Sequence, residues 1–154
     1  MSGARLRPAT AADVPRLTEL VGAAYEHYVE RLGGPPRPMT DDYAEVVRTK
    51  RVTVAERAGE IVGLIVLGVS DEGFHVDNVA VDPAHQGSGV GRALLEHAEV
   101  EARRAGFDSI YLYTHEKMSE NLALYSRIGY VEYDRRLHGD ACLVYLRKRL
   151  GAPG

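Results

Sequence analysis

The chain has 154 residues, 45% of them hydrophobic and 27% charged, which is an ordinary composition for one globular domain. With 22 acidic residues against 19 basic ones, the net charge of −3 gives no electrostatic case for binding nucleic acid. No apolar stretch approaches the ~20 residues of a transmembrane helix, and the N-terminus lacks a signal-peptide core. We therefore expect no membrane partner and a cytoplasmic location. The six histidines show no metal-ligand spacing, so no metal is expected.

The first third of the chain predicts a strand followed by a long helix. Residues 5–7 form a short strand that Pro8 stops. Thr10 or Asp13 can cap the following helix, whose apolar stripe continues to about Leu32. A run of glycines and prolines after Leu32 forbids continuation of the helix.

The rest of the chain alternates strands with helices. Runs of β-branched and aromatic residues bounded by glycine indicate strands, and apolar residues three and four apart indicate helices. The expected helices cover residues 41–50, 89–105 and 118–128, and the expected strands cover residues 52–55, 61–69, 74–81, 109–114, 130–136 and 141–146. The last two strands are expected to form an antiparallel pair around His138-Gly139-Asp140.

One run near the middle of the chain indicates a binding site. A short apolar strand, Val79–Val81, is stopped by Asp82-Pro83 and crosses a glycine-rich bend into a helix. Glycines without Cβ atoms let successive backbone N–H groups approach an anion, and the helix dipole and an arginine add positive charge. The residues of this predicted diphosphate site are Gly87, Gly89, Gly91 and Arg92.

The glycine spacing distinguishes between families of phosphate-binding loop. The residue three after Gly89 is Arg92, so the Gly-x-Gly-x-x-Gly pattern of a Rossmann fold is absent, and no Gly-Lys-Ser/Thr follows as in a P-loop. Instead, Val81-Asp82-Pro83 and the six residues from Gln86 to Gly91 resemble the acyl-CoA-binding motif of the GNAT superfamily of N-acyltransferases. That motif is a strand ending Val-x-Pro, followed by Gln/Arg-x-x-Gly-x-Gly/Ala at the start of a helix.

The resemblance implies a fold, a cofactor and a reaction. The fold is α/β (α+β), a single domain over residues 1–154 with a mixed central sheet of six to seven strands flanked by about four helices. The reaction is transfer of an acetyl group from acetyl-CoA to a primary amine by direct attack. The implied cofactor-binding residues are Val79, Ala80, Val81, Gln86, Gly87, Ser88, Gly89, Val90, Gly91, Arg92, Asn121 and Tyr125.

Acyl transfer to an amine needs a route for one proton off nitrogen and for another onto sulfur. The resemblance implies that a tyrosine four residues before a Gly-Phe/Tyr pair donates to sulfur, which makes Tyr125, before Gly129-Tyr130, the candidate general acid. Where the family often has an asparagine seven residues before this tyrosine, the chain has Met118. Asn121 stands one turn later, on a side of the helix that we expect to differ from that of residue 118.

The central strand carries two candidates for the general base. By strand alternation, His75 and Asp77 are expected on the same face as Val79, near the positions of the base in several members of the family. A histidine titrates near neutral pH, whereas the family's base is often a carboxylate that works through water. Either residue could instead be a polar group facing a solvent-filled cleft.

The acceptor site is expected at the first helix and the loop after it. Aromatic and acidic residues gather there and suit a cationic amine, although a partly exposed amphipathic helix would show the same pattern. The resemblance also implies a splay or bulge beside the central strand that frees the backbone N–H of Val79 to polarise the thioester carbonyl, with Asn78 close enough to assist. The candidate acceptor-binding residues are Tyr25, Tyr28, Arg31 and Asn78. The acceptor is a small-molecule or peptide amine, and an exposed edge near the last hairpin could pair two subunits as a homodimer. Two alternatives remain, a non-catalytic acyl-CoA sensor or regulatory module and a nucleotide-binding regulator.

Overall fold

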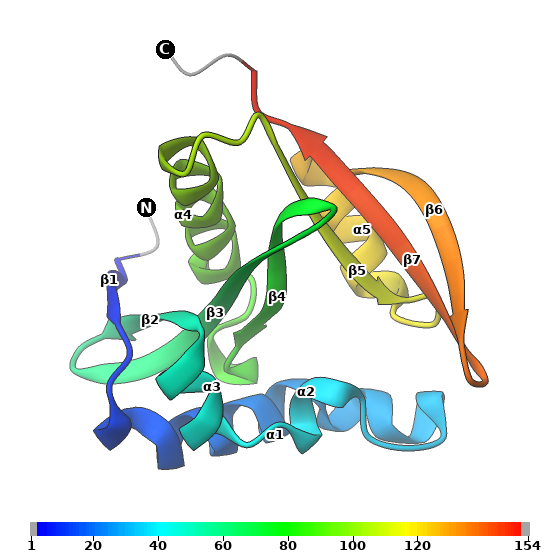
Figure 1. Cartoon of the computed structure of the whole chain (residues 1–154). Coiled ribbons are helices and arrows are strands. Elements are labelled where there is room, and N and C mark those ends of the chain that lie inside the picture. Colours follow the sequence, from blue (N-terminus) through cyan, green and yellow to red (C-terminus); the bar gives the residue numbers. More distant parts are fainter. Residues whose placement is uncertain (1–2, 152–154) are drawn as a thin grey trace.

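The computed structural model describes residues 3–151, which form seven strands and five α-helices around one sheet (Figure 1). The strands are β1 (Arg5–Pro8), β2 (Arg51–Arg57), β3 (Glu60–Ser70), β4 (Gly73–Val81), β5 (Ser109–His115), β6 (Val131–His138) and β7 (Ala141–Arg149). The helices are α1 (Val14–Leu32), α2 (Arg37–Thr40), α3 (Tyr43–Thr49), α4 (Val90–Arg104) and α5 (Ser119–Ile128). Each expected element is present, and α2, a single turn within the proline-rich segment, was not expected.

The sheet is mixed, as expected, with strand order β1-β2-β3-β4-β5-β7-β6. Within residues 3–151, all neighbouring strands are antiparallel except β4 and β5, which run parallel and pair in register only at His75 and Tyr111. Beyond this pair the two strands diverge, and the gap between their ribbons is visible in Figure 1.

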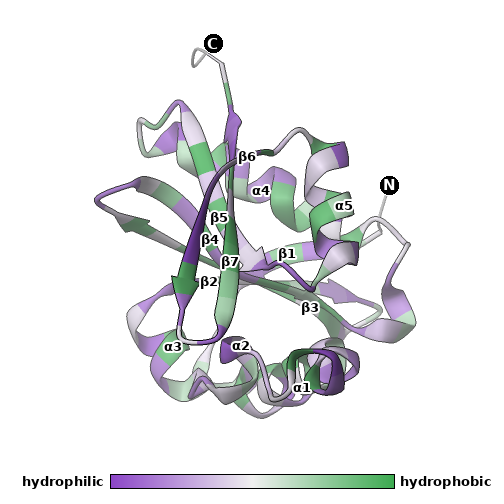
Figure 2. Cartoon of the chain, turned by 90° about the vertical axis from the view of Figure 1, so that its right-hand side faces the viewer, coloured by the Kyte–Doolittle hydropathy of each residue, from purple (hydrophilic) through white to green (hydrophobic). Residues whose placement is uncertain are grey.

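Helices cover both faces of the sheet and bury two apolar clusters. The cluster on one face joins the sheet to α4 and α5 through residues such as Leu94 and Tyr125, and the cluster on the other face joins it to α1 and α3 through residues such as Leu17 and Tyr43. In Figure 2, α1 and α4 carry both apolar and polar segments, as expected for amphipathic helices packed on a sheet. The continuous apolar run 61–67 of β3 is buried between the two layers.

Glycine ends two of the helices. Gly33 follows α1 with φ 79°, and Gly129 follows α5 with φ 113°, both in the left-handed region that favours glycine. The close crossing of α4 over β3 also requires a glycine, because a Cβ on Gly63 would lie 3.0 Å from Val90 Cγ1. Within residues 3–151, no helix combines the length and the hydropathy needed to cross a bilayer.

Candidate active site

A cleft of about 740 Å³ lies where β4 and β5 diverge. Its walls come from the segment between α1 and α2, from β4, from β5, from the start of α5, and from the β6–β7 hairpin. Six of the candidate site residues line it: Tyr25, Asp77, Asn78, Val79, Asn121 and Tyr125.

A bulge shapes the β4 wall of the cleft. Val66 of β3 pairs with Asn78 and Leu67 pairs with Val76, so Asp77 is an extra residue in the ladder. Val76 and Val79 both pack into the cluster under α4 and α5, whereas Asn78 hydrogen-bonds to residues of α1 and α3. The bulge therefore reverses the alternation of faces along β4.

This reversal corrects the expectation that His75 and Asp77 share a face with Val79. Regular alternation along the strand led to that expectation, but the extra residue places His75 on the face opposite to that of Val79. The His75 ring lies 5.1 Å from the Tyr111 ring, and a Cβ on Gly68 would lie 2.9 Å from His75 Nε2. His75 does not line the cleft, and burial lowers its pKa.

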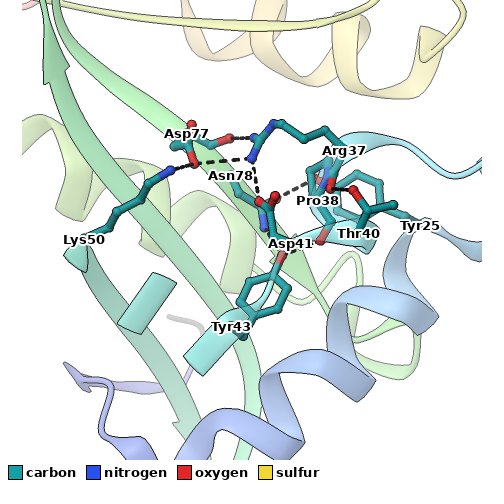
Figure 3. Close-up of polar contacts among 9 residues, drawn as sticks. All are labelled: Tyr25, Arg37, Pro38, Thr40, Asp41, Tyr43, Lys50, Asp77 and Asn78. Atoms are coloured by element: carbon teal, nitrogen blue, oxygen red, sulfur yellow. Dashed lines mark hydrogen bonds and ion pairs between the residues drawn. The ribbon is translucent and has the colours of Figure 1, made fainter. Parts of the chain in front are cut away.

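Asp77 lines the cleft and is surrounded by cations (Figure 3). Its carboxylate lies 3.1 Å from Lys50 Nζ and 3.6 Å from Arg37 Nη1. Arg37 Nη2 also donates to the backbone oxygen of Asp77 at 2.8 Å, and its other terminal nitrogen contacts the carboxylate of Asp41 at 2.5 Å. Arg37 thereby fastens the short helix α2 to the bulge.

The opposite wall of the cleft comes from α5. Tyr125 is 6% exposed, its ring packs edge-on against Tyr130 at 5.8 Å, and burial raises the pKa of its hydroxyl, which keeps it protonated at neutral pH. Asn121 Nδ2 donates to Met118 Sδ at 3.6 Å. The expectation that residues 118 and 121 face different sides was wrong, because Met118 precedes the first turn of α5 in a non-helical conformation and both side chains reach the cleft.

The glycine loop lies where β4 leads into α4, outside the cleft lining itself. Gly87 and Gly89 have φ of 79° and 91°, and Gly89 precedes the first residue of α4, where it has no side chain to cap the helix. The free N–H groups of the first turn and the adjacent Arg92, whose side chain is exposed, favour an anion at this point. The loop is held to α1 by Arg16, which donates to Asp82 at 2.7 Å.

The candidate acceptor residues separate into two groups. Tyr25 and Asn78 line the cleft, and the Tyr25 hydroxyl donates to Asn78 Oδ1 at 2.8 Å. Tyr28 is 3% exposed within the α1 cluster, and Arg31, which lies over the Tyr28 ring at 5.1 Å, pairs with Glu120 at 2.7 Å. Tyr28 and Arg31 do not line the cleft, and Arg31 instead links α1 to α5.

Sequence reasoning missed several residues that line the cleft. Tyr113 on β5 and Tyr145 on β7 stack with ring centroids 5.1 Å apart, and His138 and Asp140 reach the cleft from the last hairpin. In the sequence, the tyrosines that alternate along β5 were the signal that could have predicted this wall of the cleft. Arg37 could not be assigned, because nothing in its segment predicted the turn of α2.

Comparison with known proteins identifies the family. The family model described as an acetyltransferase (GNAT) domain matches residues 48–132. The chain belongs to the GNAT acetyltransferase family. The matched part of this GNAT domain runs from α3 to the start of β6 and contains the bulged strand, the glycine loop, α4 and α5.

Individual relatives match over part of their length. The chain is 36% identical over 84 residues to an IAA acetyltransferase from Azospirillum brasilense, a match covering 53% of this chain and 55% of the relative. It is 40% identical over 55 residues to the [ribosomal protein bS18]-alanine N-acetyltransferase of Escherichia coli K12, covering 36% and 37% of the two chains.

Solved structures share the whole GNAT fold. PaiA N-acetyltransferase from Thermoplasma acidophilum, crystallised with coenzyme A, superposes with a TM-score of 0.81 at 15% identity over 95% of this chain and 98% of its own. The ribosomal-protein-S18-alanine N-acetyltransferase from Escherichia coli gives a TM-score of 0.76 at 21% identity over 98% and 96%.

Proposed function

We propose that this GNAT domain transfers an acetyl group from acetyl-CoA to a primary amine within a ternary complex. The observation that carries the proposal is the cleft between β4 and β5, where the bulged strand at Val79 and the hydroxyl-bearing Tyr125 line the same space. The glycine loop follows directly at the end of β4. A thioester held along β4 would therefore place its diphosphate at the start of α4.

The residues of the loop fit coenzyme A. Two glycines with positive φ and the free N–H groups at the start of α4 form a cradle for a diphosphate, and Arg92 adds a charge. The backbone of β4 beyond His75 is not paired with β5, so it can bind the amide groups of the pantetheine arm as a neighbouring strand would. When bound, acetyl-CoA supplies the acetyl group as a thioester. The coenzyme A bound to the PaiA neighbour supports this assignment.

Each reacting group has a candidate partner in the chain. The backbone N–H of Val79 is the proposed donor to the thioester carbonyl oxygen. As the amine nitrogen bonds to the carbonyl carbon and the C–S bond breaks, the Tyr125 hydroxyl donates its proton to sulfur. Asp77 is the proposed acceptor of the amine proton through water, because it lines the cleft and His75 does not.

The proposed acceptor is a primary amine that meets Tyr25 and Asn78 in the cleft. The names of the relatives, which include an alanine N-acetyltransferase acting on a ribosomal protein, support an amine acceptor. We place this reaction in the cytoplasm.

We also propose that two copies pair through β6. This strand is at the edge of the sheet, and it exposes 69% of Val131 and 82% of Leu137. Sedimentation should then show a dimer that Leu137→Glu converts to a monomer; a monomeric wild type at micromolar concentration would remove this part of the proposal.

The enzymatic proposal is tested in two steps with the purified chain. Isothermal titration should show micromolar binding of acetyl-CoA that Gly89→Glu abolishes and that ATP does not compete away. A thiol-release assay over a panel of primary amines should then detect transfer. Binding without transfer to any amine would identify a non-catalytic acyl-CoA-binding module, and no binding by the folded wild type would refute the acyltransferase function.

A further inference from the structure

Two hydrogen bonds lead from the cleft to a tyrosine outside it, and a third joins that tyrosine to the backbone of Pro38 (Figure 3). The Tyr25 hydroxyl donates to Asn78 Oδ1 at 2.8 Å, Asn78 Nδ2 donates to the Tyr43 hydroxyl at 3.1 Å, and the Tyr43 hydroxyl donates to the backbone oxygen of Pro38 at 2.7 Å. Tyr25, Asn78 and Tyr43 are 8%, 5% and 3% exposed, so water does not compete freely for these groups. Tyr25 and Asn78 line the cleft, and Tyr43 does not.

The carbonyl of Pro38 sets the direction of the whole chain of hydrogen bonds. A carbonyl oxygen can only accept, so the single hydroxyl proton of Tyr43 is committed to Pro38. The Tyr43 oxygen must then accept from Asn78, which turns the amide nitrogen of Asn78 toward Tyr43 and its oxygen toward Tyr25.

The hydroxyl of Tyr25 is thereby fixed as a donor toward the protein. Its second neighbour, the backbone oxygen of Val79 at 3.1 Å, is also an acceptor, so either contact directs the proton away from the cleft. The remaining lone pair of the Tyr25 oxygen is the group that a molecule in the cleft can meet. It accepts hydrogen bonds and cannot donate one.

We propose that Tyr43 is a positioning residue for the amine substrate, because it fixes the direction of these hydrogen bonds. The Tyr25 oxygen is thereby an obligate hydrogen-bond acceptor for the N–H of the incoming amine. This inference rests on the proposed function. A primary amine carries N–H donors in both protonation states, and the contact at Tyr25 lies beside Val79, where the thioester carbonyl is expected. Without the Tyr43 hydroxyl the Asn78 amide is free to turn over, and its N–H group can then occupy the Tyr25 lone pair that the amine requires.

The test separates acceptor recognition from folding and from cofactor binding. Tyr43→Phe keeps the buried ring and removes the hydroxyl. We expect the KM for the amine to rise about 3- to 10-fold, as for one hydrogen bond in a site that excludes water, while the KM for acetyl-CoA stays within twofold and kcat changes less than the amine KM. Tyr130→Phe, a buried tyrosine outside this chain of hydrogen bonds, is the matched control and should leave the amine KM unchanged.

A double-mutant cycle supplies the second measurement. Because the effect of Tyr43 passes through the Tyr25 oxygen, Tyr43→Phe should add less than twofold to the amine KM in a Tyr25→Phe background. Additive effects, or an unchanged amine KM in folded Tyr43→Phe, would overturn the proposal. If Tyr43→Phe does not fold, Asn78→Ser breaks the chain at its middle and must raise the amine KM by a similar factor.

A readout without activity keeps the two proposals distinguishable. The side-chain amide protons of Asn78, assigned by their loss in Asn78→Ser, should exchange slowly in the wild type and at least tenfold faster in Tyr43→Phe. Protected amide protons in a wild type that transfers acetyl to no amine would refute the proposed function, and with it the role toward an amine, while confirming the hydrogen bonds. Equal exchange in the two proteins would refute the fixed direction itself.

Discussion

His75 and Tyr111 form the one register pair that joins β4 to β5 among the described residues. The strands run parallel, which brings the end of β4 beside the end of β5, and they separate immediately beyond this pair. The sheet is consequently continuous at one end and open at the other. The cleft with its candidate catalytic groups lies in the open part.

Replacing Tyr125 by phenylalanine should lower kcat by about 10²-fold or more, because the proton donor to sulfur is lost while the ring remains packed against Tyr130. Titration should show that acetyl-CoA still binds within a few-fold of the wild-type affinity. An unchanged kcat would remove Tyr125 from the mechanism.

Replacing Gly91 by glutamate should weaken acetyl-CoA binding by about tenfold or more without loss of folding. A Cβ at this position would meet Val81 Cγ2 at 3.5 Å, an ordinary contact, and Gly91 lies within α4, where glutamate is a better helix former than glycine. The added carboxylate repels a diphosphate at the first turn, whereas Gly91→Ala should bind normally, because the motif has glycine or alanine at this position.

The matched control for Gly91→Glu is Gly22→Glu on α1, where a Cβ meets nothing within 4 Å. This variant should gain about 0.5–1 kcal/mol of stability and bind acetyl-CoA normally. Loss of binding in both variants would show that helix stiffening, not charge repulsion at the loop, was responsible.

The ion pair between Arg7 and Asp13 predicts a pH-dependent part of the stability. Arg7 donates to both carboxylate oxygens, at 2.8 and 2.9 Å, and with the backbone N–H of Thr10 it lowers the pKa of Asp13 to about 2. Because the pKa is lower in the folded state, the stabilisation is complete above the ordinary value of 3.8 and is lost as the pH falls toward 2.

Urea unfolding of Asp13→Asn measures this contribution. The variant should lose about 1–2 kcal/mol at pH 7, a value reduced for the partial exposure of Arg7, and the difference from wild type should shrink steadily below pH 4. A difference that does not change with pH would show that packing, and not charge, is what the substitution removes.

Replacing Tyr130 by phenylalanine should leave stability unchanged or raise it by up to about 1 kcal/mol. The Tyr130 hydroxyl is buried without a hydrogen-bond partner among the described residues, and burial raises its pKa. Removing it relieves a desolvated polar group and leaves the ring packed on Tyr125. A thermal melt with a lower Tm would indicate a partner, such as a bound water, that the hydroxyl contacts in solution.

Much of the fold was predictable because its signals are local. The glycines and prolines that end α1, the apolar run of β3 and the glycine loop before α4 each depend on neighbours within a few residues. The resemblance of the loop to one family then implied a mixed central sheet of six to seven strands. These parts of the prediction are confirmed by the structure.

The details of the site were less predictable because they depend on pairing between distant segments. The bulge at Asp77 changes no composition or spacing within β4 and exists only in the register with β3, so alternation placed His75 on the wrong face. The hydrogen bonds from Tyr43 through Asn78 to Tyr25 join α3, β4 and α1. Neither feature has a signature in a single stretch of sequence.

The bulge also limits how this strand can change in evolution. Deleting the single codon for Asp77 would remove the bulge and restore regular alternation, with Val76, Asn78 and Val79 on the faces that they occupy now. A one-residue deletion in a regular part of β4, such as at Ala80, would instead exchange the faces of the residues beyond it. Among related chains, a one-residue deletion within β4 should therefore be confined to the bulge at Asp77, and other changes of length should fall in the connecting loops.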